Sequence, residues 1–222
     1  SPFSIVTVVA RIRGNVTEPM LRPAVGRVRE RHPNLRVRLR EDADHSLWLT
    51  SQGAGEIPIE VVPRESDGQW IETHRAASQI PFEFEERPAI RFILLHSPAV
   101  SDLIILCHHL LCDGLSLAYL ARDLLLHLGD PARPAAPLPD PTPIDRDNMP
   151  GKTAPAGIVR FFMNRINKRW QAERVTFDQE DYRALNAAYW SHFAHRIVSL
   201  EWTAEQTQAL VERCRRERVT VN

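Results

Sequence analysis

The sequence predicts an α/β fold in which helices pack on a mixed β-sheet. Short runs rich in β-branched and aliphatic residues alternate with longer runs whose apolar residues recur every three or four positions, and these periods are typical of strands and helices. Residues 102–109 are apolar on both faces, which predicts a central strand covered on both sides. Of the 222 residues, 43% are hydrophobic, which is enough to bury a sizeable core.

The strand and helix signals follow one another along the chain. Strands are expected at residues 3–12, 35–40, 46–50, 57–62, 89–96, 102–109 and 192–202. Helices are expected at residues 18–32, 70–80, 114–128, 157–173 and 203–218, several of them ended by proline or glycine. The short segment "SPAVS" between two of the strands predicts a hairpin.

Proline is concentrated between residues 131 and 156, which predicts an extended linker or a strap across a surface. This linker divides the chain into a first lobe at 1–130, the linker itself at 131–156, and a segment at 157–222. Residues 151–175 hold six Lys or Arg and one Glu. These charges are either a solvated helix face or a docking site for coenzyme A phosphates, an acidic carrier protein or a membrane surface.

Charge and composition exclude several classes of function. Lys plus Arg equals Asp plus Glu at 28 each, so bulk electrostatic binding to nucleic acid is not expected. No apolar run approaches the ~18–20 residues of a membrane span, and the first residues lack a signal-peptide pattern. The three cysteines, Cys107, Cys112 and Cys214, have no metal-binding spacing, which fits a reducing cytoplasm.

The stretch "LCHHLLCDGLS" at 106–116 places two histidines and an aspartate between two apolar runs. Its residues His108, His109, Asp113 and Gly114 stand where a central strand is expected to enter a tight loop and a helix. A neutral imidazole there can take a proton from a hydroxyl or an amine and return it to a leaving group. Asp113 can cap the amides of residue 115 or 116, or pair with an arginine.

Other interpretations of this stretch remain open at this point. A histidine at a strand end is usually structural. A metal site could use both histidines with Cys112, Asp113 and His96, but adjacent strand residues point to opposite faces and cannot easily reach one ion. Cys112 could also be a nucleophile, although only the helix start would activate its thiol.

The segment "HHLLCDG" at 108–114 resembles the HHxxxDG signature of the chloramphenicol acetyltransferase-like superfamily. That superfamily includes condensation domains of nonribosomal peptide synthetases, polyketide-associated acyltransferases and alcohol O-acyltransferases. "RHPNLRVRL" at 31–39 is similar to the RHxxLR segment of those families, and "PFEFEERPAIRFILL" at 81–95 resembles their PFxxxxxPxxR stretch. The order and spacing of the segments agree with the family.

The resemblance implies a role for each residue of the motif. His109 would be the general base that deprotonates a hydroxyl or amine acceptor attacking an acyl thioester on coenzyme A or on a carrier protein's phosphopantetheine arm. His108 would point into the lobe as a packed, hydrogen-bonded residue. Asp113 would be a structural acid paired with Arg36 or Arg91, and Gly114 would keep the channel open while its amide helps hold an oxyanion. No metal or redox cofactor is implied.

The family's fold has two similar lobes with the channel between them. By that comparison the chain holds the first lobe, a crossing helix and the start of a second lobe. We therefore expect a cytoplasmic acyltransferase whose remaining C-terminal half is a partner, so that the chain alone is inactive and prone to form oligomers. The alternatives are a condensation or epimerisation domain of a peptide synthetase, and a non-catalytic lobe that only binds acyl or carrier partners.

Overall fold

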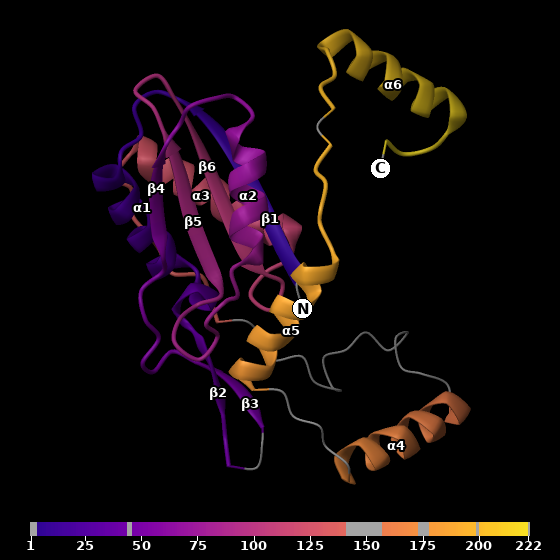
Figure 1. Cartoon of the computed structure of the whole chain (residues 1–222). Coiled ribbons are helices and arrows are strands. Elements are labelled where there is room, and N and C mark those ends of the chain that lie inside the picture. The colour runs from indigo at the N-terminus through magenta and orange to yellow at the C-terminus, as the bar shows by residue number, and fades with distance from the viewer. Residues whose placement is uncertain (1–3, 44–45, 141–156, 173–177, 199, 222) are drawn as a thin grey trace.

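A computed structural model describes residues 4–43, 46–140, 157–172, 178–198 and 200–221 of the chain (Figure 1). Its main sheet has the strand order β1-β6-β5-β4. These strands are β1 (Ile5–Arg13), β6 (Val100–His108), β5 (Ile90–His96) and β4 (Ile59–Pro63). β6 pairs antiparallel with β1 and β5, whereas β4 pairs parallel with β5, so the predicted mixed sheet is confirmed.

Strand β6 is the most deeply buried element of the fold. Residues 101–107 are all buried, and the four consecutive residues from Leu103 to Leu106 have no solvent exposure. Complete burial explains the continuous apolar run, because both faces of this strand contact side chains of covering layers. β5 and β6 form the predicted antiparallel hairpin.

Helices cover both faces of the sheet. Helices α1 (Glu18–Arg31) and α3 (Gly114–Gly129) pack against each other, and α3 also contacts β1. Helix α2 (Gln69–Gln79) contacts β6 and lies on the opposite face, since Thr7 bonds to His74 of α2 while its neighbour Val6 faces the start of α3. Figure 1 shows the sheet between these two layers.

A separate two-stranded sheet consists of β2 (Arg38–Glu41) and β3 (Leu47–Thr50), paired antiparallel. The strand predicted at 35–40 begins later than expected, because residues Pro33–Arg36 form a 3-10 turn. In this turn Leu35 is buried, and its amide donates to the carbonyl of His32. Proline at the first helical position favours such a turn over an extended start.

After residue 156, the described part of the chain forms three helices, α4 (Gly157–Ala172), α5 (Gln179–His192) and α6 (Ala204–Glu217). Helix α5 was not predicted from the sequence. It begins with a capping box between Asp178 and Asp181, and the side chain of Gln179 bonds to the backbone of Phe82 and Phe84. It is thereby attached to the first lobe, whereas α4 and α6 stand away from the main sheet in Figure 1.

The strand predicted at 192–202 is wrong. Helix α5 continues to His192, and the described residues that follow, 193–198 and 200–203, form no strand. Alternating apolar residues form a strand only when a partner strand supplies hydrogen bonds, and the described part of the chain offers none here. Most of these residues are exposed, including Val198 at 70% and Leu200 at 76%.

The described part of the predicted linker, residues 131–140, has no helix or strand and lies partly against α1, because Arg31 bonds to the backbone of residues 136 and 138. The rest of the linker, residues 141–156, lies outside the described residues. None of the described helices is long and apolar enough to cross a membrane.

Candidate functional site

The two histidines stand where β6 ends and its chain leaves the sheet. The amide of His108 donates to the carbonyl of Ala89 at 2.8 Å, and the amide of His109 donates to that of Ser4 at 2.6 Å. The next turn is closed by the amide of Leu111, which donates to the carbonyl of His108 at 2.9 Å. Hydrogen bonds therefore hold the backbone of both histidines, with His108 bonded toward β5 and His109 toward β1, at the end of the buried strand β6.

The side chain of His109 is exposed to solvent. It follows the last residue of β6 directly, so its backbone is fixed while its ring remains accessible. This combination of a fixed position and an accessible imidazole is what a general base needs in order to reach a substrate proton.

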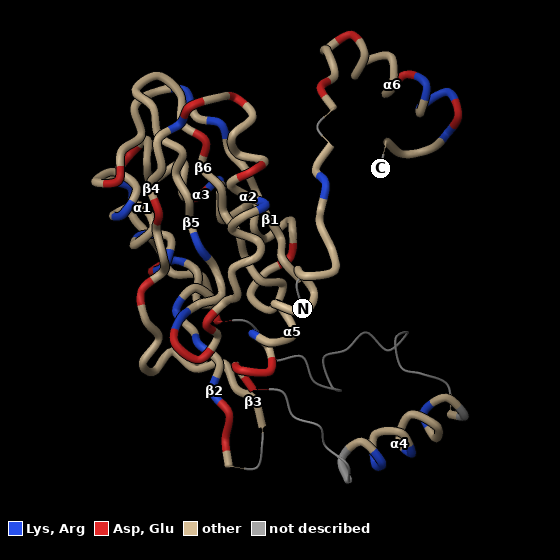
Figure 2. The backbone as a smooth tube through the Cα atoms, in the orientation of Figure 1, with Lys and Arg blue, Asp and Glu red and all other residues tan. Residues whose placement is uncertain are grey.

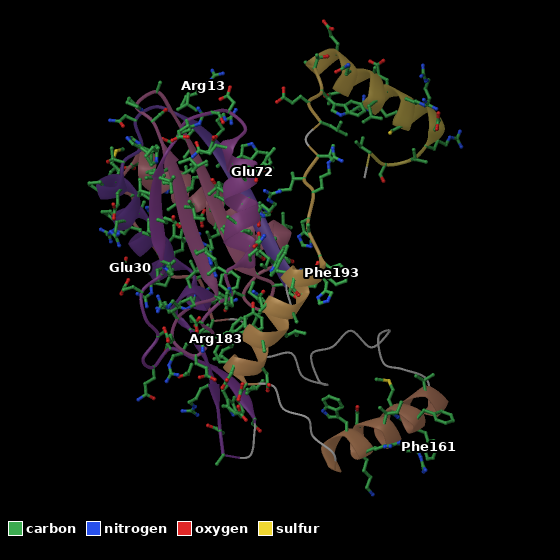
Figure 3. The ribbon with its side chains drawn as sticks, viewed as in Figure 1. Arg13, Glu30, Glu72, Phe161, Arg183 and Phe193 are labelled. Carbon is green, nitrogen blue, oxygen red and sulfur yellow. The ribbon has the colours of Figure 1, made fainter. Side chains whose placement is uncertain are left out.

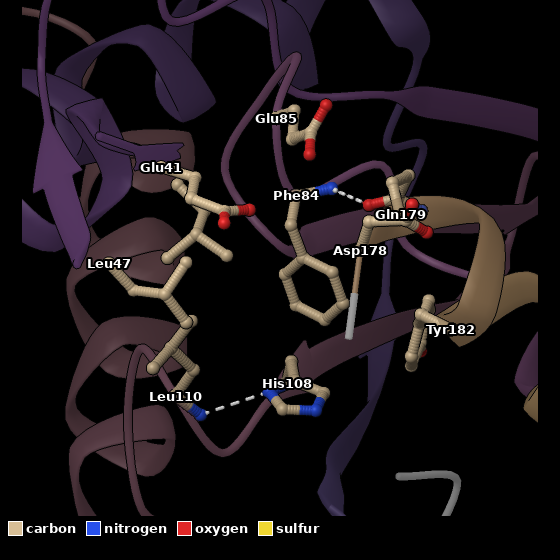
Figure 4. A pocket seen from close by; sticks show the side chains of 10 residues that line it. Glu41, Leu47, Phe84, Glu85, His108, Leu110, Asp178, Gln179 and Tyr182 are labelled. Carbon is tan, nitrogen blue, oxygen red and sulfur yellow. Dashed lines mark hydrogen bonds between the residues drawn. The ribbon is translucent and has the colours of Figure 1, made fainter. Parts of the chain in front are cut away.

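The side chain of His108 packs into the first lobe. Its ring stands edge-on to Phe84 at a centroid distance of 4.9 Å and to Phe82 at 6.2 Å. Its Nδ1 atom accepts a hydrogen bond from the amide of Leu110 at 3.1 Å (Figure 4). Its Nε2 atom is buried and has no hydrogen-bond partner among the described residues.

Burial is the largest cause that lowers the pKa of His108, to about 4, and the positive charge of the N-terminus adds to it. His108 is therefore neutral near pH 7, with its proton on Nε2, since Nδ1 is the acceptor of the bond from Leu110. Two adjacent histidines thus have different surroundings, one exposed and one packed among aromatic rings.

Asp113 is the N-cap of α3, and its carboxylate accepts a hydrogen bond from the amide of Ser116 at 2.8 Å. That bond is the main cause of the lowered pKa of Asp113. Of the two alternatives expected for this residue, the structure has the cap. Among the described residues, the carboxylate of Asp113 is bonded to this amide and not to Arg36 or Arg91.

Arg91 has other partners, which corrects its assignment as a partner of Asp113. Its guanidinium donates to the carbonyls of Ala77, Ile80 and Pro81, and it lies over the ring of Phe82 at 4.3 Å. These carbonyls lie at the end of α2, where helical carbonyls lack partners within the helix. Arg91 therefore closes that helix end.

Gly114 is the first residue of α3. A Cβ atom built on it would meet only Val6, at 4.0 Å, which is an ordinary contact. Packing within this lobe therefore does not require glycine at this position. The missing side chain leaves open space beside the loop, where a substrate could lie.

The segment "RHPNL" at 31–35 contacts both helix α3 and the loop that follows His109. Arg31 and His32 both bind the buried carboxylate of Asp123 in α3, at 2.8 Å and 3.1 Å. The side-chain amide of Asn34 donates to the carbonyl of Leu111, inside the loop that follows His109, at 2.8 Å. Sequence reasoning did not identify Asp123 or Asn34, because their partners lie about 90 and 77 residues away in the sequence.

Burial alone would raise the pKa of Asp123, but hydrogen bonds from Arg31, Arg122 and His32 outweigh it and hold the pKa below its usual range. A second buried carboxylate, Asp102, sits in β6 itself and accepts bonds from Arg11 at 2.7 Å and Arg64 at 2.8 Å. Both carboxylates stabilise the frame of the site and do not contact the histidine pair.

A pocket of about 210 Å³ opens beside His108 and Leu110 (Figure 4). Its wall combines apolar side chains with carboxylates, drawn from the β2–β3 sheet, the loop after residue 81 and the start of α5. The lining residues are Leu39, Glu41, Leu47, Phe84, Glu85, His108, Leu110, Asp178, Gln179 and Tyr182. Gln179 and Tyr182 come from the helix that the sequence did not predict.

The described residues contain no group of three or more His, Cys, Asp or Glu side chains that could hold a metal ion. The thiol of Cys112, the other alternative, lies 3.2 Å from the thiol of Cys107. It is paired with that sulfur and not with a histidine.

Comparison with known proteins identifies a family that is similar in sequence to this chain. The family model described as Condensation domain matches residues 1–128, more than half of the chain. Cyclosporin synthetase of Tolypocladium inflatum is 25% identical over 143 residues, which are 61% of this chain and 1% of the synthetase.

Solved structures share the fold at low sequence identity. SgcC5 from Streptomyces globisporus gives a TM-score of 0.57 at 21% identity, covering 99% of this chain and 51% of that one. The epimerization domain from the third module of tyrocidine synthetase B gives 0.52 at 19% identity, covering 66% of this chain and 34% of that one. The chain therefore spans about half or less of the proteins to which it is similar.

Proposed function

The chain belongs to the condensation-domain family, and from that premise we propose that it carries the general base of an acyltransferase, with His109 in that role. Condensation domains form amide or ester bonds by acyl transfer. The donor that we propose is an acyl thioester on a carrier protein or on coenzyme A, and the acceptor is an amine or a hydroxyl. The curated relatives are peptide synthetases, which favours a carrier-bound donor.

The placement of His109 is the observation that carries this proposal. Its amide donates to the carbonyl of Ser4, directly before β1, at the end of the buried strand β6, while the residue is exposed. The backbone of the neighbouring His108 is held as well, but its ring packs against Phe84 and its pKa is lowered to about 4, mainly by burial. Of the two histidines, His109 is the exposed one, whereas His108 is half-buried in the wall of the pocket.

In the proposed reaction, His109 both accepts the proton and returns it. The neutral imidazole of His109 takes the proton from the acceptor as its nitrogen or oxygen attacks the thioester carbonyl. A tetrahedral intermediate forms and collapses, the carbon–sulfur bond breaks, and the imidazolium returns the proton to the leaving thiolate. The products are the amide or ester and the free thiol.

We further propose that a second lobe completes the channel around His109, on the same polypeptide or on another. Large apolar side chains outside the first lobe are exposed, as expected of surfaces that another part of the protein covers. They include Phe161 in α4, which Figure 3 shows away from the main sheet, and Phe193 at the end of α5. Their exposed fractions are 66% and 58%.

The test is acyl transfer from a carrier-bound thioester, measured on protein in which both lobes are present. We expect His109→Ala to reduce the rate by about 10²–10⁴ while the unfolding midpoint is unchanged, because the exposed ring contributes little to packing. His192→Ala, which replaces another exposed histidine on α5, is the matched control and is expected to retain the wild-type rate. A His109→Ala variant as active as wild type would refute the assignment.

The same assay separates the two alternatives. An epimerisation domain would exchange the Cα proton of a carrier-bound aminoacyl group without forming a new bond, which is measured by deuterium incorporation. A lobe that only binds partners would give neither product, and His109→Ala would then leave carrier binding unchanged.

A further inference from the structure

Two cysteine thiols stand on either side of the histidine pair. Cys107 is in β6, directly before His108, and Cys112 is in the loop, directly before Asp113. Their sulfur atoms are 3.2 Å apart and both thiols are free. The segment between them, "CHHLLC", contains both histidines.

The two thiols differ in exposure. Cys107 has no solvent exposure, as befits a residue of the central strand. Cys112 is half-buried and lines a pocket of about 190 Å³, together with His32, Asn34 and Leu120. A small reagent therefore reaches Cys112 first, and the sulfur of Cys107 lies directly behind it.

The acidity of the thiols points in the same direction. The hydrogen bond with Cys107 lowers the pKa of Cys112, although burial opposes the shift. The same bond, together with burial, raises the pKa of Cys107. Cys112 is thus the thiol that forms a thiolate more readily, and the thiolate is the form that reacts with oxidants.

We propose that Cys107 and Cys112 are a redox modification site, at which a hydroperoxide forms an intramolecular disulfide that closes a ring around the histidine pair. The Cys112 thiolate attacks one oxygen of hydrogen peroxide, the O–O bond breaks, and a sulfenic acid and hydroxide form. The Cys107 sulfur then attacks the sulfenic sulfur, the S–S bond forms, and the oxygen leaves as water with the proton of the Cys107 thiol. Two thiols are oxidised by two electrons, and the peroxide is reduced to water.

Closing this bond displaces the loop rather than the strand. The sulfur atoms have to approach from 3.2 Å to about 2.0 Å. Cys107 is held by the pairing of β6 with β1 and β5, so the movement falls on Cys112 and the residues beside it. His109 lies in the same loop, and control of its position by the disulfide is the one consequence that rests on the proposed function.

Thiol counting by mass spectrometry tests the disulfide without any activity assay. The chain has no Lys or Arg between Arg91 and Arg122, so trypsin releases both cysteines in one peptide, residues 92–122. The protein is treated with hydrogen peroxide, denatured, alkylated and digested. We expect the untreated peptide to carry two alkyl groups and the treated peptide none, with both regained after dithiothreitol.

Two variants complete the experiment. In Cys112→Ser the thiol of Cys107 has no second thiol with which to form the disulfide. The peptide should therefore not show the loss of alkyl groups that peroxide causes and dithiothreitol reverses. Cys214→Ser removes the third thiol and should leave the result of wild type unchanged, because the bond is internal to the peptide. A treated wild-type peptide that still carries two alkyl groups would overturn the proposal, as would oxygen added at Cys112 that dithiothreitol does not remove.

Discussion

Protonation of His108 is expected to make the fold sensitive to acid. A histidine in the unfolded chain titrates near 6.5, whereas burial lowers the pKa of His108 to about 4 in the fold. Between these values the unfolded chain binds more protons than the folded one, so the free energy of unfolding falls as the pH falls. The contribution of His108 is fully present above pH 6.5 and is lost progressively toward pH 4.

The size of the effect follows from the two pKa values. At pH 5 the difference in proton binding corresponds to about 2 kcal/mol relative to pH 8. His108 is only half-buried, so solvent screening reduces this figure and we expect a loss of about 1–2 kcal/mol. Burial also lowers the pKa of His32 and of His74, which adds to the loss in the same pH range.

A variant isolates the contribution of His108 from that of the other histidines. His108→Asn cannot titrate, and its side-chain oxygen can still accept the amide of Leu110. Urea unfolding at pH 8 and pH 5, followed by circular dichroism, gives the free energy of unfolding by linear extrapolation. We expect the loss between the two pH values to be about 1–2 kcal/mol smaller in the variant than in wild type.

The matched control is His192→Asn, which changes an exposed histidine and should leave the pH dependence of wild type unaltered. If His108→Asn loses as much stability as wild type between pH 8 and pH 5, burial of a neutral His108 is not the source of the acid sensitivity, and the reasoning is refuted.

Three further predictions concern the frame of the site and its exposed surfaces. Asp113→Ala should lower the free energy of unfolding, because α3 loses its N-cap; an unchanged urea midpoint would contradict this. Asp123→Ala should cost about 3 kcal/mol in the same measurement, since Arg31 and His32 lose a buried carboxylate, and a cost no larger than that of Asp113→Ala would show that the pair is not stabilising. Light scattering on the purified 222-residue chain should detect oligomers, because α4 and the segment after α5 expose large apolar side chains, and a stable monomer would speak against that expectation.

Much of the first lobe could be predicted because its signals are local. The periodicity of residues 18–32, 70–80 and 114–128 predicted three helices that the structure contains with nearly the same ends. Continuous hydrophobicity identified the central strand, because burial on both faces leaves no room for polar residues. The position of the histidine pair at the end of this strand followed directly from it.

The errors lie where a partner decides the local structure. Residues 179–192 form a helix that the sequence did not indicate, and its start bonds to Phe82 and Phe84, nearly a hundred residues earlier. Residues 192–202 have a strand-like composition, but the described part of the chain provides no strand for them to pair with. Periodicity reports which faces can be buried and does not report what buries them.

The sequence by itself determined the fold class, the order of most elements, and the place of His109 and Asp113 in a loop between a buried strand and a helix. The capping role of Asp113 was among its alternatives because the bond spans only three residues. The tertiary structure alone decided that Arg91 closes the end of α2, that Asp123 holds Arg31 and His32, and that the thiols of Cys107 and Cys112 meet. The physical reason is that charged groups and sulfur atoms interact only when they lie within a few ångströms of each other. The number of residues between two side chains in the sequence fixes their distance in space only within a turn or a helix.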